Sequence, residues 1–142
     1  MYNSLGRLVA ILHRNNQMYL NSHLKEWDIT SAEVGILMNL FMEEGKTQEE
    51  LSKWVHIDKA ATTRTVHGLE EKGIIWRKQD SLDRRCNRIH LTQKGRELEL
   101  HVIPVVRAWS EHIAHLVGEE SYTSLCEGLE SISRALDEED EA

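Results

Sequence analysis

The sequence predicts a mainly helical chain of the α+β class, in which a short β-hairpin interrupts a series of helices. Two observations carry this prediction. Apolar residues recur at the three- and four-residue spacing of amphipathic helices, both near the ends of the 142-residue chain and in its first half. Between residues 74 and 91, two short runs, IIWRK and NRIHL, flank a segment of turn formers, as in a hairpin.

Three helices are expected before the middle of the chain. Residues 4–25 carry apolar side chains at helical spacing, which is typical of a long amphipathic helix. Thr30 has Glu33 at the spacing of a capping box, so a second helix should begin there. Thr47 and Glu50 repeat this signal and begin a short third helix.

A fourth helix is expected between Asp58, a favourable N-cap, and Gly73, a residue type common just beyond helix ends. Its spacing gives it two faces. The face toward the core comprises Thr62, Val66 and Leu69. The other side carries Lys59, Thr63, Arg64 and His67. A short helix, a tight turn and such a second helix can present these side chains to base edges and phosphates in the DNA major groove.

The hairpin that follows has a basic tip, QDSLDRRC, with Arg84 and Arg85 in the turn and Arg88 beyond it. A helix–turn–helix followed by such a hairpin is a winged helix–turn–helix by pattern. Two more helices are expected. The first begins at Thr92 and should be kinked by Pro104, and the second covers residues 119–136 and frays into the acidic end DEEDEA.

Charge is distributed unevenly along the chain. The formal net charge is −7, yet residues 46–96 carry 12 Lys and Arg against 7 Asp and Glu, while the remaining residues carry 5 against 17. Salt limits charge interactions to a range of about 8 Å at physiological ionic strength, so a local basic surface can bind phosphates despite the acidic ends.

Several classes of protein are disfavoured. No apolar stretch is long enough to span a membrane, no signal peptide is apparent, and the two cysteines, Cys86 and Cys126, cannot form a disulfide framework. We therefore expect a cytoplasmic protein. The GxSxG, P-loop, HExxH and paired CxxC motifs do not occur, so we expect neither enzymatic activity nor a cofactor.

Over nearly its whole length the chain resembles the MarR family of bacterial and archaeal transcription regulators. The resemblance lies in the succession LSKWVHIDKAATTRTVHGLEEKGII and DSLDRRCNRIHLTQKG. The wing pattern of that family is met by Asp83, Arg84, Arg85, Leu91, Thr92 and Gly95. The resemblance implies a homodimeric regulator, most commonly a repressor, that binds a pseudo-palindromic site in double-stranded DNA. It further implies a helical dimerisation region formed by residues 1–30 and 96–142, and a winged helix–turn–helix over residues 31–95.

The resemblance also assigns roles within the wing. In the family the second arginine of the pair enters the minor groove and the acidic residue helps to hold it, which here would be Arg85 and Asp83. A narrow minor groove concentrates negative potential and favours a guanidinium. Arg84 and Arg88 are expected to contact phosphates or to brace the wing. The expected DNA-binding set is completed by Lys59, Thr63, Arg64 and His67.

Family members often release DNA when a small aromatic or lipophilic effector binds between the dimer helices and the winged lobe. Residues that could line such a crevice are His13, Tyr19, Trp27, Met38 and Trp109, although for any one of them plain core packing is the better explanation.

Three alternatives remain at this point. A metal-responsive regulator is suggested by His112 and His115, which share a helix face, but no complete ligand set is apparent and no metal is expected. A redox-responsive regulator is suggested by Cys86, whose neighbour Arg85 would lower the pKa of the thiol. A winged helix that binds proteins instead of DNA is the third.

Overall fold

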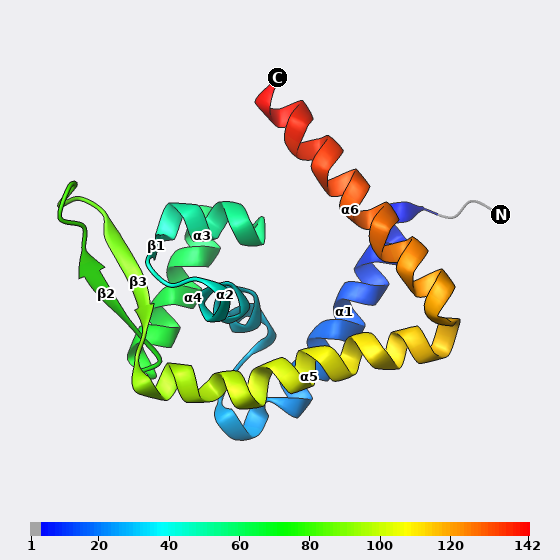
Figure 1. The fold of residues 1–142 in the computed structure, drawn as a ribbon, viewed down its shortest axis with the longest axis horizontal. Coiled ribbons are helices and arrows are strands. Elements are labelled where there is room, and N and C mark those ends of the chain that lie inside the picture. Colours follow the sequence, from blue (N-terminus) through cyan, green and yellow to red (C-terminus); the bar gives the residue numbers. More distant parts are fainter. Residues whose placement is uncertain (1–3) are drawn as a thin grey trace. The chain divides into compact units, whose positions relative to one another are not determined.

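The computed structural model describes residues 4–142 and confirms a mainly helical chain with a small antiparallel sheet (Figure 1). The helices and strands, in chain order, are α1 (Leu5–His23), η1 (Lys25–Trp27), α2 (Ser31–Met42), β1 (Lys46–Thr47), α3 (Gln48–Val55), α4 (Lys59–Glu71), β2 (Ile75–Gln79), β3 (Asn87–Leu91), α5 (Gln93–Val117) and α6 (Glu119–Glu141). Contacts between Cα atoms divide the chain into two compact units, Met1–Val106 and Arg107–Ala142.

The helices of the first unit begin where the capping signals predict. Thr30 and Glu33 form a capping box at the start of α2, and Thr47 and Glu50 form another at the start of α3. Asp58 caps α4 by accepting a hydrogen bond from the backbone N–H of Ala61 at 2.7 Å. Such side chains satisfy N–H groups that have no partner within the helix, which fixes the helix starts locally.

A single hydrophobic core holds the first unit together. Each surrounding element supplies buried apolar side chains to it, among them Leu20 of α1, Leu37 of α2, Leu51 of α3, Leu69 of α4, Ile89 of β3 and Val102 of α5. Burial of one such side chain contributes about 1.5–3 kcal/mol. The core therefore fixes α4 and the sheet against α2 and α3.

The sheet has three strands in the order β1-β3-β2, all antiparallel. Strand β2 pairs with β3 along its length, so that Ile75 lies opposite Leu91 and Gln79 opposite Asn87. The third strand, β1, was not predicted from the sequence. It consists of Lys46 and Thr47, which pair with Ile89 and Arg88, and two residues are too few to show an alternating pattern.

The second unit contains the end of α5 and all of α6. The predicted fraying after residue 136 is wrong, because α6 continues to Glu141 through a glutamate-rich segment of good helix-forming propensity. No residue of α6 is buried, and its apolar stripe is partly exposed at Leu125, Leu129, Ile132 and Leu136. Within residues 4–142, none of the helices is long and apolar enough to cross a membrane.

Candidate nucleic-acid interface

Helix α4 has the two faces that its sequence predicts. Thr62, Val66 and Leu69 are fully buried in the core. On the opposite side, Lys59, Thr63, Arg64 and His67 are all exposed to solvent. The exposed face thus presents an ammonium, a guanidinium, a hydroxyl and an imidazole, the imidazole lying 3.1 Å from the carboxylate of Glu71. Groups of these kinds recognise phosphates and base edges.

Side-chain hydrogen bonds set the position of α4 relative to α3. The hydroxyls of Ser52 and Thr62 lie 2.7 Å apart in the buried contact between the two helices. At the exposed edge of this contact, the amide of Gln48 donates to the hydroxyl of Thr63 at 2.6 Å. The turn between the helices includes His56 in the left-handed conformation, with φ of 54°. The start of α4 is therefore fixed at both the buried and the exposed side.

The tip of the wing is organised around Asp83. Its carboxylate accepts hydrogen bonds from the backbone N–H and from Nε of Arg85, both at 3.1 Å, and from Nη2 at 3.4 Å. These bonds from Arg85 lower the pKa of the Asp83 carboxyl. The side chain of Arg85 remains 91% exposed. Asp83 therefore orients the guanidinium without removing it from solvent.

The other two wing arginines are placed differently. Arg88 donates to the carbonyl oxygen of Gly45 at 2.8 Å and to the carboxylate of Asp80 at 3.3 Å, so it braces the wing against the segment before β1. Arg84 is exposed, and its backbone carbonyl accepts from the amide of Gln79 at 2.9 Å.

The expected lowering of the Cys86 pKa is wrong. Burial, together with the charge of Asp83 and a hydrogen bond from the thiol to its carboxylate at 3.7 Å, raises the pKa of Cys86. Arg85 favours the thiolate, but its guanidinium is held by Asp83 and its influence is the smaller one. At neutral pH the thiol is therefore protonated, which weakens the case for a redox switch at this position.

Two polar residues beside the interface, Gln48 and Arg77, were missed from the sequence. Arg77 of β2 donates from Nε to the carboxylate of Glu70 at 3.2 Å and from Nη1 to the amide oxygen of Gln48 at 3.5 Å. Gln48 in turn contacts Thr63 of α4. This series of hydrogen bonds joins strand β2 to both helices of the helix–turn–helix. No local pattern marks it, because its members are separated by 7 to 29 positions along the chain.

The five candidate effector residues come from several elements of the two units. Tyr19, Trp27 and Met38 are partly buried and pack against the core of the first unit, His13 is exposed on α1, and Trp109 belongs to the second unit. Trp27 also stacks on His101, with ring centroids 4.5 Å apart. These two rings line an open hollow of about 400 Å³ whose other lining residues include Glu26, Lys94 and Glu97.

The histidines considered as metal ligands do not form a cluster that could hold an ion. Across residues 4–142, no group of three or more His, Cys, Asp or Glu side chains has a suitable arrangement. The rings of His112 and Trp109 pack at a centroid distance of 6.3 Å.

Comparison with known proteins identifies the family. Residues 29–87 match the family model for the MarR family. The chain is 28% identical over 141 residues to the HTH-type transcriptional regulator BilQ of Clostridioides difficile, covering 97% of this chain and 95% of that protein.

Solved structures agree. A MarR transcriptional regulator from Methanosarcina mazei is 30% identical and superposes with a TM-score of 0.85, covering 92% of this chain and 94% of that one. A mutant MarR from E. coli complexed with operator DNA is 25% identical, with a TM-score of 0.82 and coverage of 90% and 92%. The chain therefore belongs to the MarR family of transcriptional regulators.

Proposed function

We propose that this regulator binds a pseudo-palindromic operator as a homodimer and represses transcription from it. The observation that carries the proposal is the exposed polar face of α4 beside a wing whose Arg85 guanidinium is oriented but solvated. The solved structure of a mutant MarR with operator DNA supports the same use of a similar fold.

Helix α4 enters the major groove in this proposal. Lys59 and Arg64 contact phosphates or guanine edges, and Thr63 and His67 lie where they can reach base edges. The bond from Gln48 to Thr63 limits the rotation of the threonine side chain, so the α4 surface is ordered before DNA arrives. A surface ordered in advance loses less side-chain entropy on binding.

The wing supplies the second contact. Arg85 enters a minor groove that flanks the site of α4, where the negative potential of a narrow groove favours a guanidinium. Asp83 holds the arginine in a small set of orientations through its three hydrogen bonds. Arg84 is free to reach a phosphate, and Arg88 keeps the wing in place through Gly45 and Asp80.

Dimerisation uses the two ends of the chain, residues 1–30 and 96–142, while residues 31–95 bind DNA. Support comes from apolar side chains that are unusually exposed in a single chain. On α1 they are Leu5, Leu8, Val9 and Leu12, and on α6 they are Leu125, Leu129, Ile132 and Leu136. Stripes of this length mark surfaces that a partner covers, and a two-fold dimer covers the same stripe on both chains.

Release of DNA follows when a small aromatic or lipophilic effector changes the separation of the two winged regions of the dimer. His13, Tyr19, Trp27, Met38 and Trp109 remain the candidates for contacts with such a molecule. An effector acts only if its affinity differs between the DNA-binding arrangement and the released one.

The operator can be found by selection from a random duplex library with the wild-type protein, followed by sequencing. We expect an inverted repeat whose half-sites have centres about 10 base pairs, one helical turn, apart. Sedimentation of the complex should give two chains per duplex. If no sequence is enriched over several rounds at low salt, DNA recognition is not the function of this surface.

A further inference from the structure

A buried carboxylate lies behind the DNA-facing side of α4. Glu33, in the first turn of α2, has a side chain that is only 6% exposed. One of its oxygens, Oε1, accepts the capping-box hydrogen bond from the backbone N–H of Thr30 at 2.9 Å. A buried carboxylate requires a partner for its remaining charge, because an unpaired buried charge is strongly destabilising.

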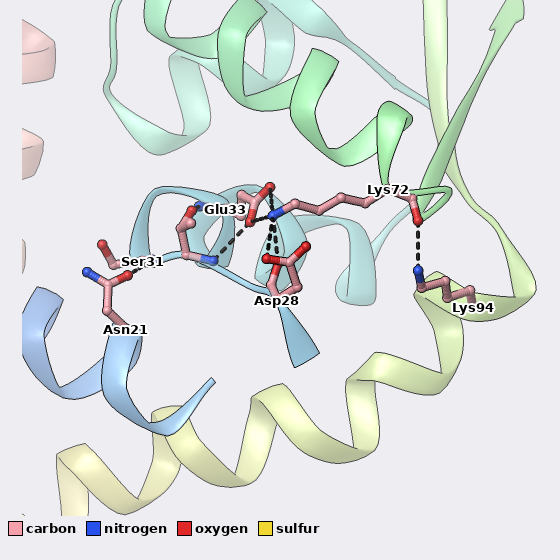
Figure 2. Close-up of polar contacts among 7 residues, drawn as sticks. Asn21, Asp28, Ser31, Glu33, Lys72 and Lys94 are labelled. Carbon is pink, nitrogen blue, oxygen red and sulfur yellow. Dashed lines mark hydrogen bonds and ion pairs between the residues drawn. The ribbon is translucent and has the colours of Figure 1, made fainter. Parts of the chain in front are cut away.

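That partner is Lys72, the residue that caps the C-terminal end of α4. Figure 2 shows the lysine reaching from the end of α4 to Glu33 and to the turn at Asp28. Its ammonium donates to the two carboxylate oxygens at 2.8 and 3.0 Å and to the backbone carbonyl of Asp28 at 2.6 Å. Glu33 thus caps α2 and holds the end of α4.

The ammonium of Lys72 is surrounded by acceptors of the protein itself. An ammonium carries three N–H donors, and three acceptors surround this one at hydrogen-bonding distance. Its charge is also balanced by Glu33, and the carboxylate of Asp28 lies 4.0 Å from the same ammonium. Lys72 is therefore unlike Lys59 at the other end of α4, which is exposed to solvent.

The contacts extend from this pair to both helices that flank the winged region. The backbone carbonyl of Lys72 accepts from the ammonium of Lys94 in the first turn of α5 at 2.8 Å. On the other side, the side chain of Asn21 in α1 accepts from the backbone N–H of Ser31 at 2.8 Å, at the start of α2 (Figure 2). The end of α4 is thus connected through polar contacts to α2 and α5, and the start of α2 is connected to α1.

We propose that Lys72 is a positioning residue for operator recognition, which sets the direction of α4 by anchoring its C-terminal end to Glu33. The start of α4 is fixed independently by the Asp58 cap and the Ser52–Thr62 contact. Without the Glu33–Lys72 contact, the C-terminal end of α4 is held by core packing and by the bond from Lys94 to the Lys72 carbonyl, and the helix axis can tilt. In a dimer, such a tilt changes the match to half-sites at a fixed separation. This inference rests on the proposed function.

The test compares Lys72→Met with wild type on three kinds of duplex: the operator selected by the wild type, the same operator with one base pair inserted or removed between half-sites, and an unrelated sequence. Affinities are measured by fluorescence anisotropy over a salt series. Lys25→Met is the matched control, because Lys25 is an exposed lysine of η1 that belongs neither to the α4 and wing surfaces nor to the apolar stripes of α1 and α6 proposed for the dimer. Thermal unfolding establishes that each variant is folded at the assay temperature.

We expect Lys72→Met to bind the selected operator roughly 3- to 30-fold more weakly, the range seen for residues that couple sites without touching the ligand. Binding to unrelated DNA and the salt dependence should stay at the wild-type values. The preference for the native half-site separation should become weaker. Lys25→Met should behave as wild type in every assay.

Two results would overturn the proposal. One is that Lys72→Met distinguishes the native half-site separation from the altered ones as strongly as the wild type does. The other is an equal loss of affinity on all duplexes with a salt slope shallower by about one for each lysine, which indicates a direct phosphate contact.

If Lys72→Met fails to fold, Glu33→Gln/Lys72→Met replaces it, since the glutamine keeps the capping acceptor and leaves no buried charge. The same two results in this variant overturn the proposal. If the wild type itself shows no sequence preference, the proposed function fails. Because the wild type is measured alongside the variants, this result can be told apart from a failure of the Lys72 proposal.

Discussion

Substitution of Gly95 by alanine should destabilise the protein through a backbone collision. Gly95 lies in the first turn of α5, and a Cβ built on it would lie 2.2 Å from the carbonyl oxygen of Ile74 and 3.0 Å from a methyl group of Leu91. Real Cβ contacts are essentially never shorter than 3.0 Å, so the two backbone segments must separate by at least about 0.8 Å. The 2.2 Å contact is with a backbone carbonyl oxygen, which cannot turn aside as the end of a flexible side chain can.

The magnitude follows from what that separation disturbs. The same Ile74 carbonyl accepts from the backbone N–H of Thr92 at 2.9 Å, a bond that contributes about 0.5–1.5 kcal/mol. Overpacking adds about 1–3 kcal/mol. The better helix propensity of alanine returns up to about 1 kcal/mol. We therefore expect the free energy of unfolding to fall by about 1–4 kcal/mol.

The assay is urea unfolding followed by circular dichroism at one fixed protein concentration, since a dimer's stability depends on concentration. Gly35→Ala in α2 is the matched control, because its Cβ would meet the side chain of Val55 at the ordinary distances of 3.4 and 3.9 Å. The control should be unchanged or more stable by up to about 1 kcal/mol. If Gly95→Ala is as stable as Gly35→Ala, the close approach of α5 to the end of α4 does not constrain residue 95.

Further predictions concern the wing, the start of α4 and the dimer. In a Cys126→Ser background, iodoacetamide should alkylate Cys86 slowly at pH 8, because burial and Asp83 raise the pKa of the thiol. Asp83→Asn should speed the reaction, and an unchanged rate would contradict the role of Asp83. NMR titration should give Asp83 a pKa below its ordinary value, and in Arg85→Ala this pKa should move back toward that value. The stability that the ionised Asp83 contributes should therefore be present at neutral pH and be lost as the pH falls through the lowered pKa. Asp58→Ala should lower the free energy of unfolding by about 1 kcal/mol, and Asp58→Asn should restore most of that in the same denaturation assay. Leu129→Asp should convert dimers to monomers in sedimentation experiments, and a persistent dimer at micromolar concentration would refute its place in the interface.

Much of the first unit could be predicted because its signals are local. The starts of α2, α3 and α4 depend on a capping side chain and a backbone N–H three residues away, both readable from spacing. The buried face of α4 follows from helical periodicity alone, and Thr62 is buried as predicted although it is polar. Its hydroxyl is satisfied by Ser52 and by the carbonyl of Asp58, a detail that spacing does not indicate.

Apart from the end of α6, the failures arise from partners distant in sequence or from the direction of a side chain. Strand β1 exists because Lys46 and Thr47 pair with β3, more than forty positions away. Lys72 and Glu33 are 39 positions apart, so neither suggested the other. For Cys86, the adjacent arginine was taken as the dominant charge, whereas the folded wing directs that guanidinium to Asp83 and brings the same carboxylate to the thiol.

Operator recognition by α4 and the wing is tested by the salt dependence of DNA binding, measured for wild type and Arg85→Ala by fluorescence anisotropy between about 50 and 200 mM salt. The duplexes are the selected operator and an unrelated sequence, with Lys25→Ala as the charge-matched control. We predict tight, selective and steeply salt-dependent binding by the wild type and by Lys25→Ala. Arg85→Ala should bind the operator more weakly, with a slope shallower by up to about 2 per dimer, since each neutralised phosphate contributes about 0.9. An Arg85→Ala protein that matches the wild type on both duplexes, or a wild type that binds neither at low salt, would contradict the account.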